Sequence, residues 1–227
     1  PKEYIPLSWA FFYSASGGDN DIFGNEIVIE HTDPGSKTLA AAFFITGGME
    51  GFGGKFYDNH ITSNVPPIWI AGKYGGASRS LITNNTIVKS KGALPDYKPF
   101  LMGFDGCRDC VAKEVVIRSN KIVNDTFAIR MGGAGHSFSV QWKLDLKTVA
   151  KNGRPAANRE VVVKDDTDAV VWEGNTDEAG QASCYLESYS MKDGRQLTRK
   201  PYRVISGGVT KPVLMDKDML IVLPLKK

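Results

Sequence analysis

The sequence predicts an all-β protein built from two parts, a repetitive solenoid followed by a separate β-sheet module. Helical periodicity is almost absent, because no stretch of a dozen residues keeps its apolar positions three and four residues apart. A short pattern containing Asn recurs at intervals of 26 to 35 residues, a period typical of units that bury their apolar sides by stacking on one another. After about Ser139 this repeat stops, and alternating strands with frequent turn residues follow.

The repeat has an apolar residue three positions before an Asn and an Ile two positions after it. Asn tolerates the left-handed backbone of a tight bend, and stacked Asn side chains can hydrogen-bond from one coil to the next. We expect the flanking apolar residues to point inward. The pattern therefore predicts a structural ladder formed by Asn25, Asn59, Asn85 and Asn120.

A second repeated element is an apolar triplet that ends near a Gly, at residues 43–47, 68–72, 100–103 and 128–132. Gly permits a corner of the backbone that other residues adopt with difficulty. One unit is then a strand, a Gly turn, a variable loop, a second strand, an Asn bend and a short third strand. That order is one coil of a parallel β-helix, and we expect about four to five coils.

These repeats resemble those of the right-handed parallel β-helix repeat proteins. That family consists of secreted and cell-surface proteins, many of which bind, cleave or epimerise acidic polysaccharides. The resemblance covers roughly residues 8 to 139 and implies a right-handed solenoid in a secreted or cell-surface protein. The same coil also carries adhesins and structural proteins, so the resemblance implies architecture more than chemistry.

The second part has strand-like segments at residues 140–146, 160–165, 169–174, 183–186, 202–205 and 219–223. With Asn-Gly-x-Pro at 152–155 and Thr-Asp-x-x-Gly at 176–180, this succession resembles the carboxypeptidase-regulatory-like, or transthyretin-like, β-sandwich family over residues 140 to 225. Such modules are usually non-catalytic. We predict a parallel β-helix over 1–139 and a β-sandwich accessory domain over 140–227. Pro1 leads almost directly into repeat-like sequence without the features of a secretory signal, so we expect upstream coils to be missing.

Composition excludes some classes of partner. The net charge of +3 has no large basic block behind it, which argues against nucleic-acid binding. No apolar run reaches the roughly 18 residues of a membrane span. We expect a polysaccharide or glycan as the partner, together with self-association through the ends of the β-helix, where strand edges are unpaired.

The sequence predicts no metal and no cofactor. Cys107 and Cys110 form a single Cys-x-x-Cys, whereas a structural zinc site needs four ligands and the three His residues are scattered. A local disulfide and a pair of buried thiols both remain open for the two cysteines, and Cys184 lies far away. Calcium is the one alternative, through Asp165, Asp166, Asp168 and Asp177, although turns favour Asp for backbone reasons alone.

Candidate catalytic residues lie in loops that lengthen particular coils. The family resemblance implies that a polysaccharide lyase would use Lys or Arg as its base, and a glycosidase needs two carboxyl groups about 5 to 9.5 Å apart. The candidates are Asp105, Arg130, Lys73 and Arg79, with Asp58 or Asp109 as a second carboxylate.

Aromatic residues give a binding alternative. Counted back three residues from the Gly corner, Phe44, Trp69 and Phe100 fall in register on successive coils. If their rings point outward, sugar rings can stack on them, and if they point inward they are core. The leading hypothesis is a glycan-binding or structural role. Its rivals are a polysaccharide lyase or glycoside hydrolase and an assembly or adhesion component.

Overall fold

The structure is a computed structural model that describes residues 7–14, 20–32, 39–46, 54–71, 76–93 and 97–225. Within these ranges the regular elements are all strands, so the predicted all-β class is confirmed. The same ranges hold no helix long and apolar enough to cross a membrane. The chain divides into two compact units, and each is described by itself. Unit 1 comprises residues 1–138 with 191–195, and unit 2 comprises residues 139–190 with 196–227.

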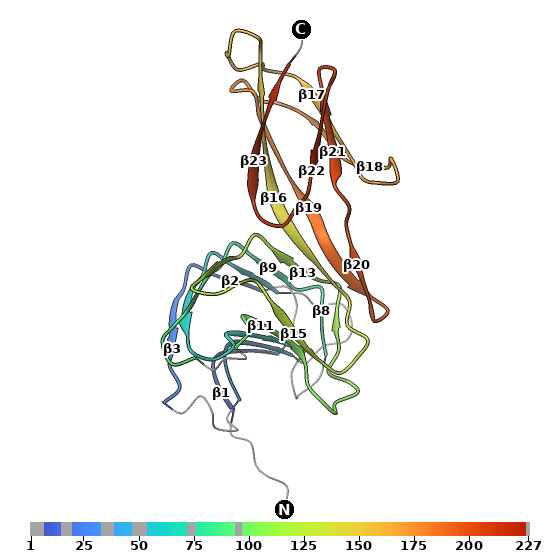
Figure 1. Cartoon of the computed structure of the whole chain (residues 1–227). Helices are drawn as coiled ribbons and strands as arrows, with labels where there is room; N and C mark the ends of the chain where they lie inside the picture. Colours follow the sequence, from blue (N-terminus) through green and yellow to red (C-terminus); the bar gives the residue numbers. More distant parts are fainter. Residues whose placement is uncertain are drawn as a thin grey trace, which may run out of the picture. The chain divides into compact units, whose positions relative to one another are not determined.

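Unit 1 is made of parallel strands in three main runs. The first run is the five-stranded sheet β1 (Leu7–Ser14), β4 (Leu39–Thr46), β7 (Ile68–Ile70), β11 (Phe100–Gly103) and β15 (Ile129–Gly132). The second contains β3 (Glu26–Ile29), β6 (His60–Ser63), β10 (Thr86–Lys89) and β14 (Lys121–Val123). The third contains β2 (Asp21–Phe23), β5 (Lys55–Tyr57), β9 (Leu81–Thr83) and β13 (Val115–Arg118), while β8 (Ala77–Ser78) pairs with β12 (Ala112–Lys113). The chain visits the three runs in the same order in each repeat. Figure 1 labels their members on different sides of the unit: β2, β9 and β13 above, β3 at the left, and β1, β11 and β15 below.

Equivalent apolar residues of successive repeats lie opposite one another in these runs. Ile61 pairs in register with Ile27 and with Ile87 in the second run, and Phe56 pairs with Ile82 in the third. Because side chains alternate between the two faces of a strand, one face of each run carries the apolar set into the core. Phe56, Ile61, Ile82 and Ile87 are fully buried.

The asparagines of the repeat form a continuous chain of side-chain hydrogen bonds. The Nδ2 of Asn25 donates to Oδ1 of Asn59 at 2.8 Å, Asn59 donates to Asn85 at 2.9 Å, and Asn85 donates to Asn120 at 2.9 Å. The left-handed backbone belongs to the preceding residue and not to the Asn, which differs from our expectation. The residues with positive φ are Gly24, Asp58, Asn84 and Ser119.

The identification of this chain with the right-handed parallel β-helix repeat proteins is wrong, and so is its identification with the carboxypeptidase-regulatory-like sandwich family. Over the described ranges the strands belong to several parallel and mixed sheets, and no closed solenoid is present. The physical reason lies in what the repeat specifies. A bend and an amide ladder need only the neighbouring parallel strand, so the Asn pattern does not by itself require a closed coil.

The remaining strands belong wholly or mainly to unit 2: β16 (Phe138–Val149), β17 (Glu160–Lys164), β18 (Val170–Asn175), β19 (Gln181–Lys192), β20 (Arg195–Thr198), β21 (Tyr202–Ser206), β22 (Val209–Val213) and β23 (Met219–Pro224). Four of them form an antiparallel sheet in the order β18-β17-β21-β22. Strand β23 pairs in parallel with β16. Every second residue of β16 is buried, as its alternating sequence predicts, and Leu144 and Leu146 lie in the core with Val161 and Val163 of β17.

Candidate functional site

A pocket of about 180 Å³ lies in unit 1 where strands β11 and β15 end. We call it the Arg130 pocket. Its lining is mainly apolar, and its two charged residues come from β15 and from the loop after β11. The lining residues are Trp69, Leu101, Met102, Gly103, Phe104, Asp105, Arg130 and Gly132.

Two glycines allow the loop after β11 to lie close against β15. Gly103 has a φ of +73°, and a Cβ there would overlap the carbonyl oxygen of Gly132 and the ring of His136. A Cβ on Gly132 would lie 2.9 Å from the backbone nitrogen of Asp105. Both positions are therefore closed to side chains, and this close approach puts Asp105 beside the end of β15.

His136 hydrogen-bonds to two backbone segments next to the pocket. The backbone N–H of Ala112 donates to its Nδ1 at 3.1 Å, and its Nε2 lies 2.9 Å from the carbonyl oxygen of Gly132. Since Nδ1 accepts, Nε2 must carry the hydrogen and donate, which assigns the neutral tautomer. The side chain is buried. Sequence reasoning missed this role, because a lone His carries no local signal for it.

A disulfide closes the loop that carries Phe104 and Asp105. Cys107 and Cys110 are bonded, with their Cα atoms 5.5 Å apart. The backbone N–H of Cys107 also donates to the carbonyl oxygen of Phe104 at 3.1 Å. Of the two states that the sequence left open for this pair, the structure contains the disulfide, and its cross-link restricts the loop beside the pocket.

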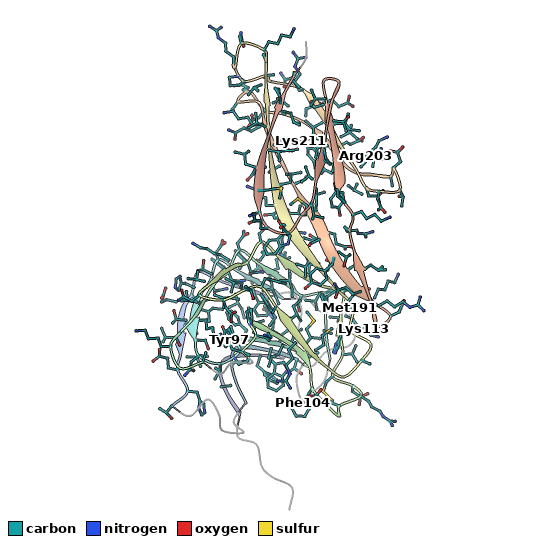
Figure 2. The ribbon with its side chains drawn as sticks, in the orientation of Figure 1. Tyr97, Phe104, Lys113, Met191, Arg203 and Lys211 are labelled. Atoms are coloured by element: carbon teal, nitrogen blue, oxygen red, sulfur yellow. A yellow bond between two sulfur atoms is a disulfide. The ribbon has the colours of Figure 1, made fainter. Side chains whose placement is uncertain are left out.

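Aromatic rings form the apolar wall of the pocket. Trp69 contacts Phe44 edge-on at 4.8 Å between ring centroids and stacks on Phe104 at 5.9 Å. The indole Nε1–H of Trp69 donates to the carbonyl oxygen of Gly103 at 2.8 Å, so its polar group is already used. Leu101 and Phe104 are partly exposed against this cluster. Figure 2 labels Phe104 near the periphery of unit 1.

The structure does not bring the three predicted stacking aromatics onto one face. Trp69 lies opposite Phe44 and Leu101, whereas Phe100 lies opposite Ile68. A shift of one residue moves a side chain to the other face of the sheet. Phe100 accordingly packs on Phe127 in the core, with ring centroids 5.3 Å apart.

The predicted alignment of Phe100 with Trp69 is wrong because the glycines after the two strands are not equivalent positions. Ile70 pairs with Met102, so the residue equivalent to Gly103 is Ala71, which has a φ of +56°. In the sequence the Gly of the β11 repeat (Gly103) therefore comes one position earlier, relative to the paired residues, than the Gly of the β7 repeat. Phe44, Trp69 and Phe100 are all at most 3% exposed, so none presents a free ring face for stacking.

Of the three catalytic candidates that the structure describes, two lie together. Nη2 of Arg130 is 3.6 Å from Oδ2 of Asp105, and both side chains are more than half exposed. Arg79 pairs with Glu114 at 3.2 Å and does not line the pocket. Lys73 lies outside the described residues. Neither Asp58 nor Asp109 lines the pocket, so Asp105 is its single carboxylate among the described residues.

The acidic residues considered for calcium have protein partners. Asp165 accepts hydrogen bonds from the backbone and hydroxyl of Thr167 and from the backbone of Ala169, and these bonds, led by the hydroxyl, lower its pKa. Asp166 pairs with Lys200, Asp168 pairs with Arg203 and Lys164, and Asp177 accepts from two backbone N–H groups of its own turn. In the ranges that the structure describes, no three His, Cys, Asp or Glu residues are grouped to hold a metal ion.

No family model matches the chain, and no curated protein or solved structure is significantly similar to it. This finding agrees with the correction of the family resemblance above. The Arg130 pocket is therefore the feature of the described residues from which a function can be inferred.

Proposed function

We propose that this chain is a non-catalytic glycan-binding protein that holds one sugar ring in the Arg130 pocket. A single observation carries this proposal: an apolar wall, made by the partly exposed Leu101 and Phe104 packed on the buried Trp69, meets the exposed Asp105–Arg130 pair in one small hollow. Sugars combine an apolar face of C–H groups with hydroxyl groups at the ring edge, and a site for them needs both kinds of surface.

The size of the pocket favours a single ring. Its volume of about 180 Å³ is below the roughly 300–1,000 Å³ of pockets that enclose drug-sized molecules. Further sugars of a chain would extend over the surrounding surface. We therefore expect affinities for monosaccharides to be weak, in the millimolar range that corresponds to about 4 kcal/mol.

The charges of the pocket favour binding over hydrolysis. A glycosidase needs two carboxyl groups on either side of the scissile bond, and Asp105 is the one carboxylate among the described lining residues. Its partner Arg130 is a guanidinium, which does not lose its proton in proteins and is a poor general base. A lyase or hydrolase remains the alternative: absorbance at 235 nm in the experiment below detects the product of a lyase, and the NMR spectra detect the new reducing ends that a hydrolase releases.

We also propose a secreted or cell-surface location. The Cys107–Cys110 disulfide supports it, because such bonds persist in oxidising compartments. In this proposal the stacked parallel strands of unit 1 are the scaffold for the pocket, and the sheets of unit 2 pack as a β-sandwich accessory module.

The test is a titration of the whole chain with a panel of neutral and acidic oligosaccharides, followed by NMR, with absorbance at 235 nm recorded for unsaturated products. We expect binding without product, and we expect Phe104→Ala to weaken binding by about tenfold through loss of the apolar wall. Phe23→Ala is the matched control, since Phe23 is 57% exposed elsewhere in unit 1 and packs on Tyr57. Absence of binding, or equal losses in the two variants, would refute the proposal, and rising absorbance would establish a lyase.

Assembly is a second candidate that one observation favours. Strands β1, β3 and β2 are the terminal members of their runs, so over the described residues each has one edge without a partner strand. Unpaired edges are templates for pairing with another chain. Sedimentation velocity over a hundredfold range of concentration tests this, since end-to-end association would raise the sedimentation coefficient with concentration.

A further inference from the structure

We infer that the Arg130 pocket selects an uncharged sugar ring with two neighbouring hydroxyl groups and discriminates against sugars that carry a carboxylate. This inference depends on the proposed function, which leaves the class of sugar open. It also departs from the expectation of acidic polysaccharides that the family resemblance implied.

Arg130 and Asp105 present a hydrogen-bond donor and an acceptor side by side. Nη2 of Arg130 and Oδ2 of Asp105 lie 3.6 Å apart at the rim of the pocket. A guanidinium only donates, and an ionised carboxylate only accepts. A hydroxyl group does both, so two adjacent hydroxyls can accept from Arg130 and donate to Asp105 together. A ligand carboxylate can satisfy Arg130 but has no proton to give to Asp105.

The balanced charge of the pocket also disfavours an anionic ligand. Arg130 and Asp105 contribute opposite unit charges, so the described lining of the pocket has no net charge. A uronate bound to Arg130 would bring a second negative charge next to Asp105, and like charges at this distance repel. A neutral ring keeps the existing pair and strengthens its own hydrogen bonds through the charges of both partners.

The backbone on both sides of the ion pair is held in place by contacts within unit 1. Asp105 is held by the close approach of its loop to Gly132 and by the disulfide two residues further on, and the end of β15 is held by His136. Loops fixed in their bound geometry lose less freedom when a ligand arrives. The backbone that carries Asp105 is therefore held beside β15 before binding, which keeps its carboxylate within reach of Arg130.

The experiment compares a methyl hexopyranoside with the matched methyl hexuronate by NMR titration of the whole chain. We expect the wild type to bind the hexoside at least about tenfold more tightly. Asp105→Asn should weaken hexoside binding by about tenfold and narrow the difference between the two sugars, because it removes the repulsion along with the acceptor charge. Arg130→Gln should weaken the binding of both sugars.

Glu114→Gln is the control variant, because Glu114 forms an ion pair of comparable exposure with Arg79 outside the pocket; it should change neither affinity. Thermal unfolding of each variant checks that the fold is retained. Tighter binding of the uronate by the wild type, or unchanged hexoside binding in Asp105→Asn, would overturn the inference while leaving glycan binding intact. Failure of both sugars and of the oligosaccharide panel would instead overturn the proposed function itself.

Discussion

Asn85 has all the polar atoms of its side chain engaged and is fully buried. Its Oδ1 accepts from the backbone N–H and the Nδ2 of Asn59, and its Nδ2 donates to Oδ1 of Asn120 and to the carbonyl oxygen of Phe56. Replacement by Ala leaves several buried groups without partners, and each such group costs about 1–3 kcal/mol. The ladder is therefore a source of stability and not only a mark of the repeat.

We expect Asn85→Ala to reduce the free energy of unfolding by about 3 kcal/mol or more. Asn25→Ala is the matched control at the end of the ladder, where the side chain is partly exposed and water can replace lost hydrogen bonds; its expected cost is about 1 kcal/mol. Urea unfolding followed by circular dichroism measures both. Equal losses in the two variants would contradict a role that depends on burial within the ladder.

The bend before each ladder asparagine was predicted only in part from the sequence. The recurrence of Asn predicted hydrogen bonding between repeats, because the pattern directly displays the residues that stack. It did not predict that the positive φ would fall one position earlier, on residues as different as Gly24, Asp58 and Ser119. Gly and Asn are the residues that usually adopt a positive φ. Here the residue before each ladder Asn adopts it whatever its type, because the following amide is fixed in the ladder.

Strand β11 illustrates the same limit for a whole element. Its existence and its apolar character follow from the triplet at its start, but its register against β7 does not. Counting back three residues from Gly103 selects Phe100, whereas Leu101 is the residue that lies opposite Trp69. Because the side-chain period of a strand is two, an error of one residue is enough to exchange core and surface.

The register leads to a direct test. Phe100→Ala should reduce the free energy of unfolding by about 4 kcal/mol, because a fully buried ring is removed from the core beside Phe127. Leu101→Ala, on the other face of the same strand, should cost less stability but weaken sugar binding, since Leu101 lines the Arg130 pocket. Urea unfolding and the NMR titration measure the two effects. Loss of binding with full stability in Phe100→Ala would instead support the outward, stacking alternative for that ring.

Three titratable groups of unit 2 couple the stability of the chain to alkaline pH: Cys184 and Tyr202 are buried, and Tyr189 is half-buried. Burial raises the pKa of Cys184 from its ordinary 9.0 to about 12 and the pKa values of Tyr189 and Tyr202 from 10.0 to about 12. Each group is neutral in the folded chain at neutral pH. Once the pH passes the ordinary values, the unfolded chain releases these protons more readily than the folded one, so unfolding becomes more favourable.

We therefore expect the urea midpoint to be insensitive to these three groups below about pH 8 and to fall as the pH rises from 9.0 towards 12. Cys184→Ala should delay the onset of this fall to the region of the tyrosines, near pH 10.0. Unfolding curves at intervals of half a pH unit measure the effect. A midpoint that stays constant or rises up to pH 11 would contradict it.

From the amino-acid order alone, the all-β class follows, as does the stacking of the Asn repeats, because both depend on residues that are close in sequence or repeat at a regular interval. The candidate site follows only in part. Asp105 and Arg130 were singled out from their loop and strand, but their pairing and the wall formed by Trp69 and Phe104 required the strands to be aligned. The register of β11 and the closing of the loop onto β15 are settled by contacts between residues about 30 positions apart, where packing and backbone hydrogen bonds outweigh local preference.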